Sequence, residues 1–139
     1  MPKAMDHIVL NVEGMGTMLV FYTEVIGLVP ERLEEFNAGK VPFPSLRINR
    51  DTVIDLFPRH LWMKKRSKVK GQPNLNHFCI LFKKEEWDRL RRRLKDHKVV
   101  IEDGPGIRWG AHGMGISIYF RDPEKNLIEA RYYKEKKSL

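Results

Sequence analysis

Four side chains with metal-binding chemistry stand at matching places in the two halves of the sequence. His7 and His77 each lie in the first apolar segment of a half, 70 residues apart, and Asp55 and Glu129 each lie in the last, 74 residues apart. Neutral imidazoles with carboxylates suit zinc, manganese, iron(II), cobalt or nickel, whereas calcium takes mostly oxygen ligands. A carboxylate buried in an apolar strand is costly without a cation. The set therefore predicts one divalent metal ion.

The same residues also have a purely structural interpretation. His7 and His77 would then be hydrogen-bonded core residues, and Asp55 and Glu129 would pair with Arg47 and Arg131. For any one of the four residues taken alone, this interpretation is the better one. For four residues at equivalent positions of a repeat, the metal site is favoured.

The first half of the chain alternates between strand and helix patterns. Residues 7–12 are rich in branched and large apolar side chains, which favours a strand. Apolar residues at helical spacing follow from Met15 to Ile26, and Gly27 predicts the end of that helix. Three short strands are then expected, around Val29–Phe36, Ser45–Asn49 and Thr52–Phe57.

The second half repeats this order. An apolar strand over Asn76–Phe82 precedes an amphipathic helix over Lys84–His97, which turns Trp87, Leu90 and Leu94 inward. The remaining expected elements are a strand over Val99–Glu102, a glycine-rich loop over Gly104–Gly115, a strand over Ile116–Phe120, a turn over Asp122–Asn126 and a strand over Leu127–Tyr133. Each half therefore reads βαβββ, which predicts an α+β fold built from two modules.

Composition limits the class of protein. The 139 residues suffice for one globular domain, and 42% of them are hydrophobic, too many for a disordered chain. A single cysteine, Cys79, excludes an intrachain disulfide. No apolar run reaches the ~18 residues that a membrane span requires. Residues 1–6 lack the apolar stretch of a secretory signal, so we expect a cytoplasmic protein.

The positive charge is concentrated between the halves. The net charge is +8, and no acidic residue occurs between Asp55 and Glu85. We interpret residues 58–75 as a basic connector that joins module 5–57 to module 76–133 within a single domain, 1–139. A solvated linker is favoured over a nucleic-acid site, because no zinc-finger, RNP or P-loop pattern accompanies the charge. The overall charge still favours a small anionic substrate.

Four segments resemble the vicinal oxygen chelate superfamily, which comprises glyoxalases, bleomycin-resistance proteins and extradiol dioxygenases. These segments are Asp6–Leu10, Phe21–Leu28, Asn76–Ile80 and Phe120–Glu129. The resemblance covers the chain from Met5 to Tyr133, and it is closest to glyoxalase-domain proteins of unknown substrate. It implies two βαβββ modules that form a cup-shaped, mostly antiparallel sheet around a metal ion. It also implies a homodimer.

The resemblance assigns His7, His77 and Glu129 as metal ligands. Asp55 occupies the position of a glutamate in glyoxalase I enzymes and is one methylene shorter. We therefore expect Asp55 to hold a metal-bound water as general base rather than to bind the metal directly. Tyr119 is a second candidate acid or base.

Four further residues are expected to contact the substrate because strand parity or a neighbouring strand places them near the ligands. They are Asn11, Arg47, Ser117 and Arg131. The resemblance implies that the substrate binds the metal through two adjacent oxygens, in a lyase, isomerase or ring-cleaving dioxygenase reaction. The alternative is a non-catalytic protein of the same fold that sequesters a small molecule.

Overall fold

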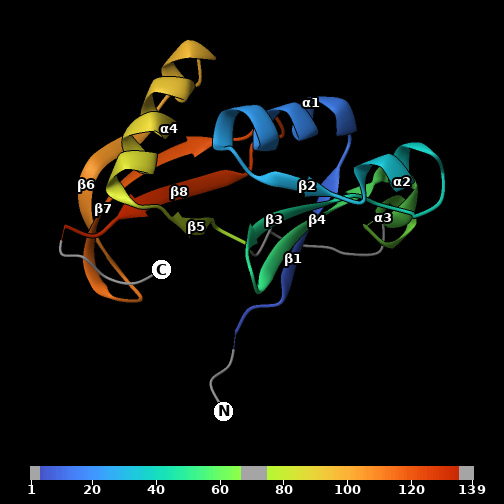
Figure 1. Ribbon diagram of the computed structural model, residues 1–139, viewed down its shortest axis with the longest axis horizontal. Helices are drawn as coiled ribbons and strands as arrows, with labels where there is room; N and C mark the ends of the chain where they lie inside the picture. The colour runs from blue at the N-terminus through green and yellow to red at the C-terminus, as the bar shows by residue number, and fades with distance from the viewer. Residues whose placement is uncertain (1–3, 67–74, 135–139) are drawn as a thin grey trace. The chain divides into compact units, whose positions relative to one another are not determined.

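The computed structural model describes residues 4–66 and 75–134, with side chains described except at 64–66 (Figure 1). The chain divides into two compact units, residues 1–72 and 73–139. Each unit contains a four-stranded sheet with one parallel and two antiparallel strand pairs. The predicted α+β class with two βαβββ modules is confirmed. No helix in the described ranges is long and apolar enough to cross a membrane.

The first unit has the sheet order β1-β4-β3-β2. Its elements are β1 (His7–Val12), α1 (Met15–Val20), the π-helix η1 (Phe21–Ile26), β2 (Val29–Glu31), α2 (Leu33–Asn37), β3 (Ser45–Asn49), β4 (Thr52–Pro58) and α3 (Arg59–Arg66). Gly27 ends the α1–η1 segment with φ of 91°, a left-handed conformation that glycine adopts without strain. Along β1, Leu10 and Val12 are buried while His7, Val9 and Asn11 are exposed. One face of this strand therefore belongs to the core and the other carries the candidate site.

Two expectations for the first unit need correction. The strand expected over Val29–Phe36 is wrong beyond Glu31, because Arg32 takes a left-handed conformation (φ 61°) and a short helix, α2, follows. The first part of the expected connector, Arg59–Arg66, forms helix α3, whereas residues 67–74 lie outside the described part of the chain.

The second unit has the equivalent sheet order, β5-β8-β7-β6. Its elements are β5 (Phe78–Leu81), α4 (Lys84–Asp96), β6 (Asp103–Gly110), β7 (Gly113–Arg121) and β8 (Leu127–Tyr132). Helix α4 buries Trp87, Leu90 and Leu94 as predicted, and the Trp87 indole donates a hydrogen bond of 2.9 Å to the Ala130 carbonyl of β8. The helix thus covers one face of this sheet and leaves the Glu129 face to the site.

The segment between α4 and β8 differs most from expectation. The strand expected over Val99–Glu102 is not formed, and the expected glycine-rich loop is instead a hairpin of β6 and β7. Its glycines have a packing reason: a Cβ at Gly110 would lie 1.8 Å from Nη1 of Arg131, and one at Gly115 would lie 3.1 Å from the Tyr133 ring. Glycine is required at these two strand positions because the side chains of Arg131 and Tyr133 occupy the space that a Cβ would need.

Candidate functional site

The two units place a histidine and a carboxylate in the same local arrangement. In the first unit Asp55 on β4 pairs in register with Val9 on β1, two residues after His7. In the second unit Glu129 on β8 pairs with Cys79 on β5, two residues after His77. The predicted equivalence of these residues therefore holds at the level of strand register.

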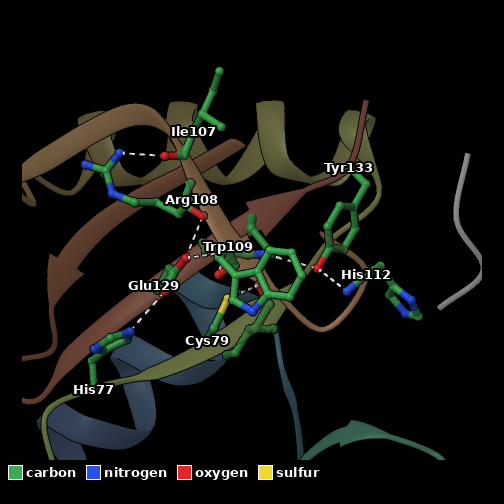
Figure 2. A network of polar contacts seen from close by, with 12 residues as sticks. His77, Cys79, Ile107, Arg108, Trp109, His112, Glu129 and Tyr133 are labelled. Atoms are coloured by element: carbon green, nitrogen blue, oxygen red, sulfur yellow. Dashed lines mark hydrogen bonds and ion pairs between the residues drawn. The ribbon is translucent and has the colours of Figure 1, made fainter. Parts of the chain in front are cut away.

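The second unit brings His77 and Glu129 into direct contact (Figure 2). His77 Nε2 lies 3.0 Å from Glu129 Oε1, and His77 Nδ1 lies 2.6 Å from Asn76 Oδ1. An amide oxygen only accepts hydrogen bonds, so Nδ1 donates to Asn76 and Nε2 is the ring nitrogen that faces the carboxylate. Two lone pairs at this distance would repel, so the contact requires either a proton on Nε2 or a cation between the two atoms. In both cases the Asn76 side chain sets the orientation of the ring.

Glu129 is a buried carboxylate whose charge is stabilised by hydrogen bonds. Its side chain is 5% exposed, and Oε2 accepts from Ser117 Oγ at 2.6 Å and Arg131 Nη2 at 2.9 Å. Burial alone would raise the pKa of Glu129, but the hydrogen bonds from Ser117 and Arg131 outweigh it and the pKa lies below its ordinary value. Half of the structural interpretation is therefore correct, because Glu129 does pair with Arg131.

His7 is oriented like His77, by the side chain of the preceding residue. Its Nδ1 lies 2.7 Å from Asp6 Oδ2, so the contact with Asp6 is made by Nδ1 and not by Nε2. The hydrogen bond with Asp6, followed by the charge of Asp55, raises the pKa of His7. In both histidines the side chain of the preceding residue therefore binds Nδ1 and not Nε2.

Asp55 is buried, and its Oδ1 accepts a 2.6 Å hydrogen bond from Ser45 Oγ. Arg47 does not pair with it: Nε and Nη2 of Arg47 bind the Glu31 carboxylate at 2.8 and 2.9 Å. The Asp55–Arg47 pair, which belonged to the structural interpretation, is therefore wrong. The sequence did not lead us to Ser45. The signal that could have identified it is its position on the strand next to Asp55, two residues before Arg47 and on the same face.

Among the described residues, no three His, Cys, Asp or Glu side chains come together as a metal-binding group. Each unit by itself offers one histidine and one carboxylate. The chemistry of these pairs fits a divalent ion such as zinc or manganese, because it combines an imidazole nitrogen with an anionic oxygen. Asn11 is exposed on the His7 face of β1, where it was expected to lie.

Tyr119 lies beside the His77–Glu129 pair. Its ring packs edge-to-face on His77 at a centroid distance of 5.6 Å. Burial and the charge of Glu129 raise the pKa of Tyr119, so its hydroxyl stays protonated. Arg108, which the sequence reasoning missed because its strand was taken for a loop, lies over the same ring at 5.8 Å and pairs with Asp103.

Arg131 and Ser117 are both buried, with 4% and 0% exposure. Arg131 also donates from Nη2 to the Trp109 carbonyl at 2.8 Å and from Nη1 to Tyr133 Oη at 3.1 Å. Tyr133 in turn accepts from the His112 backbone at 3.0 Å (Figure 2). The Trp109 side chain is 76% exposed although its carbonyl is held in this network.

Comparison with known proteins identifies the family of this chain. The sequence profile of the Glyoxalase/Bleomycin resistance protein/Dioxygenase superfamily matches residues 4–130, and the chain belongs to this superfamily. It is 30% identical over 128 residues to virulence protein STM3117 of Salmonella typhimurium, covering 92% of this chain and 83% of that protein. It is 29% identical over 137 residues to the glyoxalase domain-containing protein RDO1 of Mycosarcoma maydis, covering 97% of this chain and 71% of that protein.

Solved structures show the same fold. The crystal structure of STM3117 superposes with a TM-score of 0.70 over 96% of this chain and 98% of that one, at 24% identity. A glyoxalase/dioxygenase from Nostoc punctiforme superposes with a TM-score of 0.69 over 94% and 90% of the chains, at 26% identity. The resemblance inferred from the sequence is confirmed.

Proposed function

We propose that this chain is a divalent-metal-dependent enzyme that uses His7, His77 and Glu129 as ligands and acts on a small oxygenated anion. The observation that carries the proposal is the His77–Glu129 contact, in which ring nitrogen Nε2 faces carboxylate oxygen Oε1 at 3.0 Å. His7 supports it, because Asp6 binds Nδ1 of its ring and not the equivalent Nε2. The superfamily and the repeated strand register support a shared role for the two histidines.

The bound metal would supply Lewis-acid stabilisation of negative charge on substrate oxygens, in a lyase, isomerase or ring-cleaving dioxygenase reaction. Within this proposal Asp55 is the general base, because it is a buried carboxylate with one hydroxyl partner and no cationic partner on the neighbouring strand. Tyr119 donates a hydrogen bond or proton, since its raised pKa keeps the hydroxyl protonated. Asn11 and Arg47 would contact the substrate from the first unit.

The test is metal binding followed by turnover. Protein purified without chelator is analysed by atomic emission, and metal-free protein is titrated calorimetrically with Zn²⁺, Mn²⁺, Co²⁺ and Ni²⁺. The loaded protein is then assayed with the hemithioacetal of methylglyoxal and glutathione and with a catechol. Binding of one ion per chain, together with turnover of either substrate, would support the proposed enzyme. Absence of any bindable divalent ion would refute the metal dependence and favour the sequestration protein.

Assembly as a homodimer is a separate expectation. Ile107, Trp109 and Met114 on the β6–β7 hairpin expose 63%, 76% and 63% of their surface, an apolar cluster of the kind that marks protein contacts. Strands β2 and β6 are also sheet edges within their units. We expect sedimentation velocity at tens of micromolar, roughly the range of ordinary dimer affinities, to show a dimer. A monomer alone at that concentration contradicts the expectation.

A further inference from the structure

The two oxygens of the Glu129 carboxylate have different surroundings. Oε2 accepts both strong hydrogen bonds, from Ser117 Oγ at 2.6 Å and from Arg131 Nη2 at 2.9 Å. Oε1 faces His77 Nε2 at 3.0 Å (Figure 2). Two donors on a single oxygen hold the carboxylate plane in one orientation and leave only Oε1 toward the histidine.

The donors are themselves immobilised. The Arg131 guanidinium is held by the Trp109 carbonyl and the Tyr133 hydroxyl, and Nη1 lies so close to Gly110 that a Cβ there would be 1.8 Å away. Ser117 has no exposed surface. This clamp, defined as Ser117 and Arg131, is therefore held in place by burial and by further hydrogen bonds.

The clamp is not optimised for stability. Arg131 Nε is the one buried side-chain nitrogen or oxygen without a hydrogen-bond partner among the described residues. A buried guanidinium that leaves a donor unsatisfied costs stability, and an apolar pair would avoid that cost. Arg131 therefore places Nη2 on Glu129 Oε2 while its Nε is left without a partner.

We infer that Ser117 and Arg131 are positioning residues that make Glu129 a one-oxygen ligand, bound through Oε1 alone. The inference rests on the proposed metal site and replaces the substrate-contact role expected for these two residues. A carboxylate that binds a metal ion through both oxygens leaves less room for a substrate than one that binds through a single oxygen. By holding Oε2 away, Ser117 and Arg131 would leave room for a substrate that chelates the ion.

The test uses Co²⁺ alone as the probe, with the full chain and no substrate. Metal-free Ser117→Ala is titrated with Co²⁺, and the visible spectrum is recorded. We expect affinity to fall about 10–100-fold, the range for loss of a group that orients a ligand. We also expect weaker visible absorption, because release of Oε2 raises the coordination number. Arg131→Lys, which keeps a charge but loses the planar fork, should change the spectrum in the same direction.

Thr23→Val is the control. It removes a part-buried hydroxyl on η1 that makes a hydrogen bond of 2.7 Å to the Leu19 carbonyl, outside the proposed site. We expect Co²⁺ affinity within about twofold of the unaltered protein, well below the tenfold that marks an orienting group. Circular dichroism melts establish that each variant is folded.

The outcomes separate the two proposals. If the unaltered protein binds no Co²⁺, the proposed metal site itself fails. If it binds Co²⁺ but Ser117→Ala has the same affinity and spectrum, only the positioning role is overturned. Equal weakening by Ser117→Ala and Thr23→Val would also overturn it, because the effect would then belong to the loss of any hydrogen-bonded hydroxyl.

Discussion

Replacement of His77 by alanine, or of Glu129 by glutamine, removes most of the affinity for divalent metal ions. His77→Ala removes an imidazole, and Glu129→Gln replaces a carboxylate by a neutral amide, at two proposed ligands whose facing atoms lie 3.0 Å apart. The expected loss is at least about 100-fold, the upper end of what loss of an orienting group alone produces. Atomic emission on purified protein and calorimetric titration with Zn²⁺ or Mn²⁺ measure it. Equal metal content in the unaltered protein and both variants would contradict the proposed ligands.

The two variants should differ in stability, which provides an internal check. The His77 side chain is 33% exposed, so alanine there leaves the packing largely intact. Glutamine at position 129 removes the charge beside the buried Arg131 guanidinium, and a buried ion without its partner is destabilising. We therefore expect a lower melting temperature for Glu129→Gln than for His77→Ala. His97→Ala, at the exposed end of α4, is the control and should retain metal and stability.

Asp55→Ala should retain most of the metal but lose turnover by about 10²- to 10⁴-fold, the contribution typical of a general base. The aspartate is short, and one of its two carboxylate oxygens already accepts a hydrogen bond from the Ser45 hydroxyl. Asp55→Glu adds a methylene, and we expect it to reach the metal and tighten binding. Metal titration measures the change in affinity. Steady-state kinetics, with whichever of the two proposed substrates is turned over, measures the change in rate.

Asp51→Ala is the matched control for this pair, because it removes an exposed carboxylate from the turn between β3 and β4. Metal loss in Asp55→Ala as complete as in His77→Ala would make Asp55 a direct ligand and refute the water-holding role. Unchanged metal and unchanged turnover would remove Asp55 from the mechanism altogether.

The repeat was predictable because it depends on local patterns. Branched apolar residues with a histidine at one end define β1 and the approach to β5, and each half closes on an apolar strand that carries one carboxylate. Residue spacing alone then places Asp55 and Glu129 in equivalent registers. The same reasoning located the inward face of α4, since Trp87, Leu90 and Leu94 repeat at helical spacing.

The partners of charged groups were less predictable. Both Glu31 and Asp55 are anions on strands that flank Arg47, and only the three-dimensional geometry shows that Arg47 binds Glu31. The β6–β7 hairpin was mistaken for a loop because its glycines are usually a sign of turns. Here Gly110 and Gly115 make room for Arg131 and Tyr133, which arrive from a strand later in the chain.

The network around Arg131 also gives the protein an optical reporter. Of its three tryptophans, Trp62 and Trp87 are 5% and 2% exposed, whereas Trp109 is 76% exposed. An aqueous quencher such as iodide therefore reaches one emitter and spares two. Arg131 Nη2 donates both to the Trp109 carbonyl and to the Glu129 carboxylate. A shift of the Glu129 carboxylate would therefore move the backbone of Trp109. Ligand binding at Glu129 then becomes readable in the red-shifted part of the emission, without any added label.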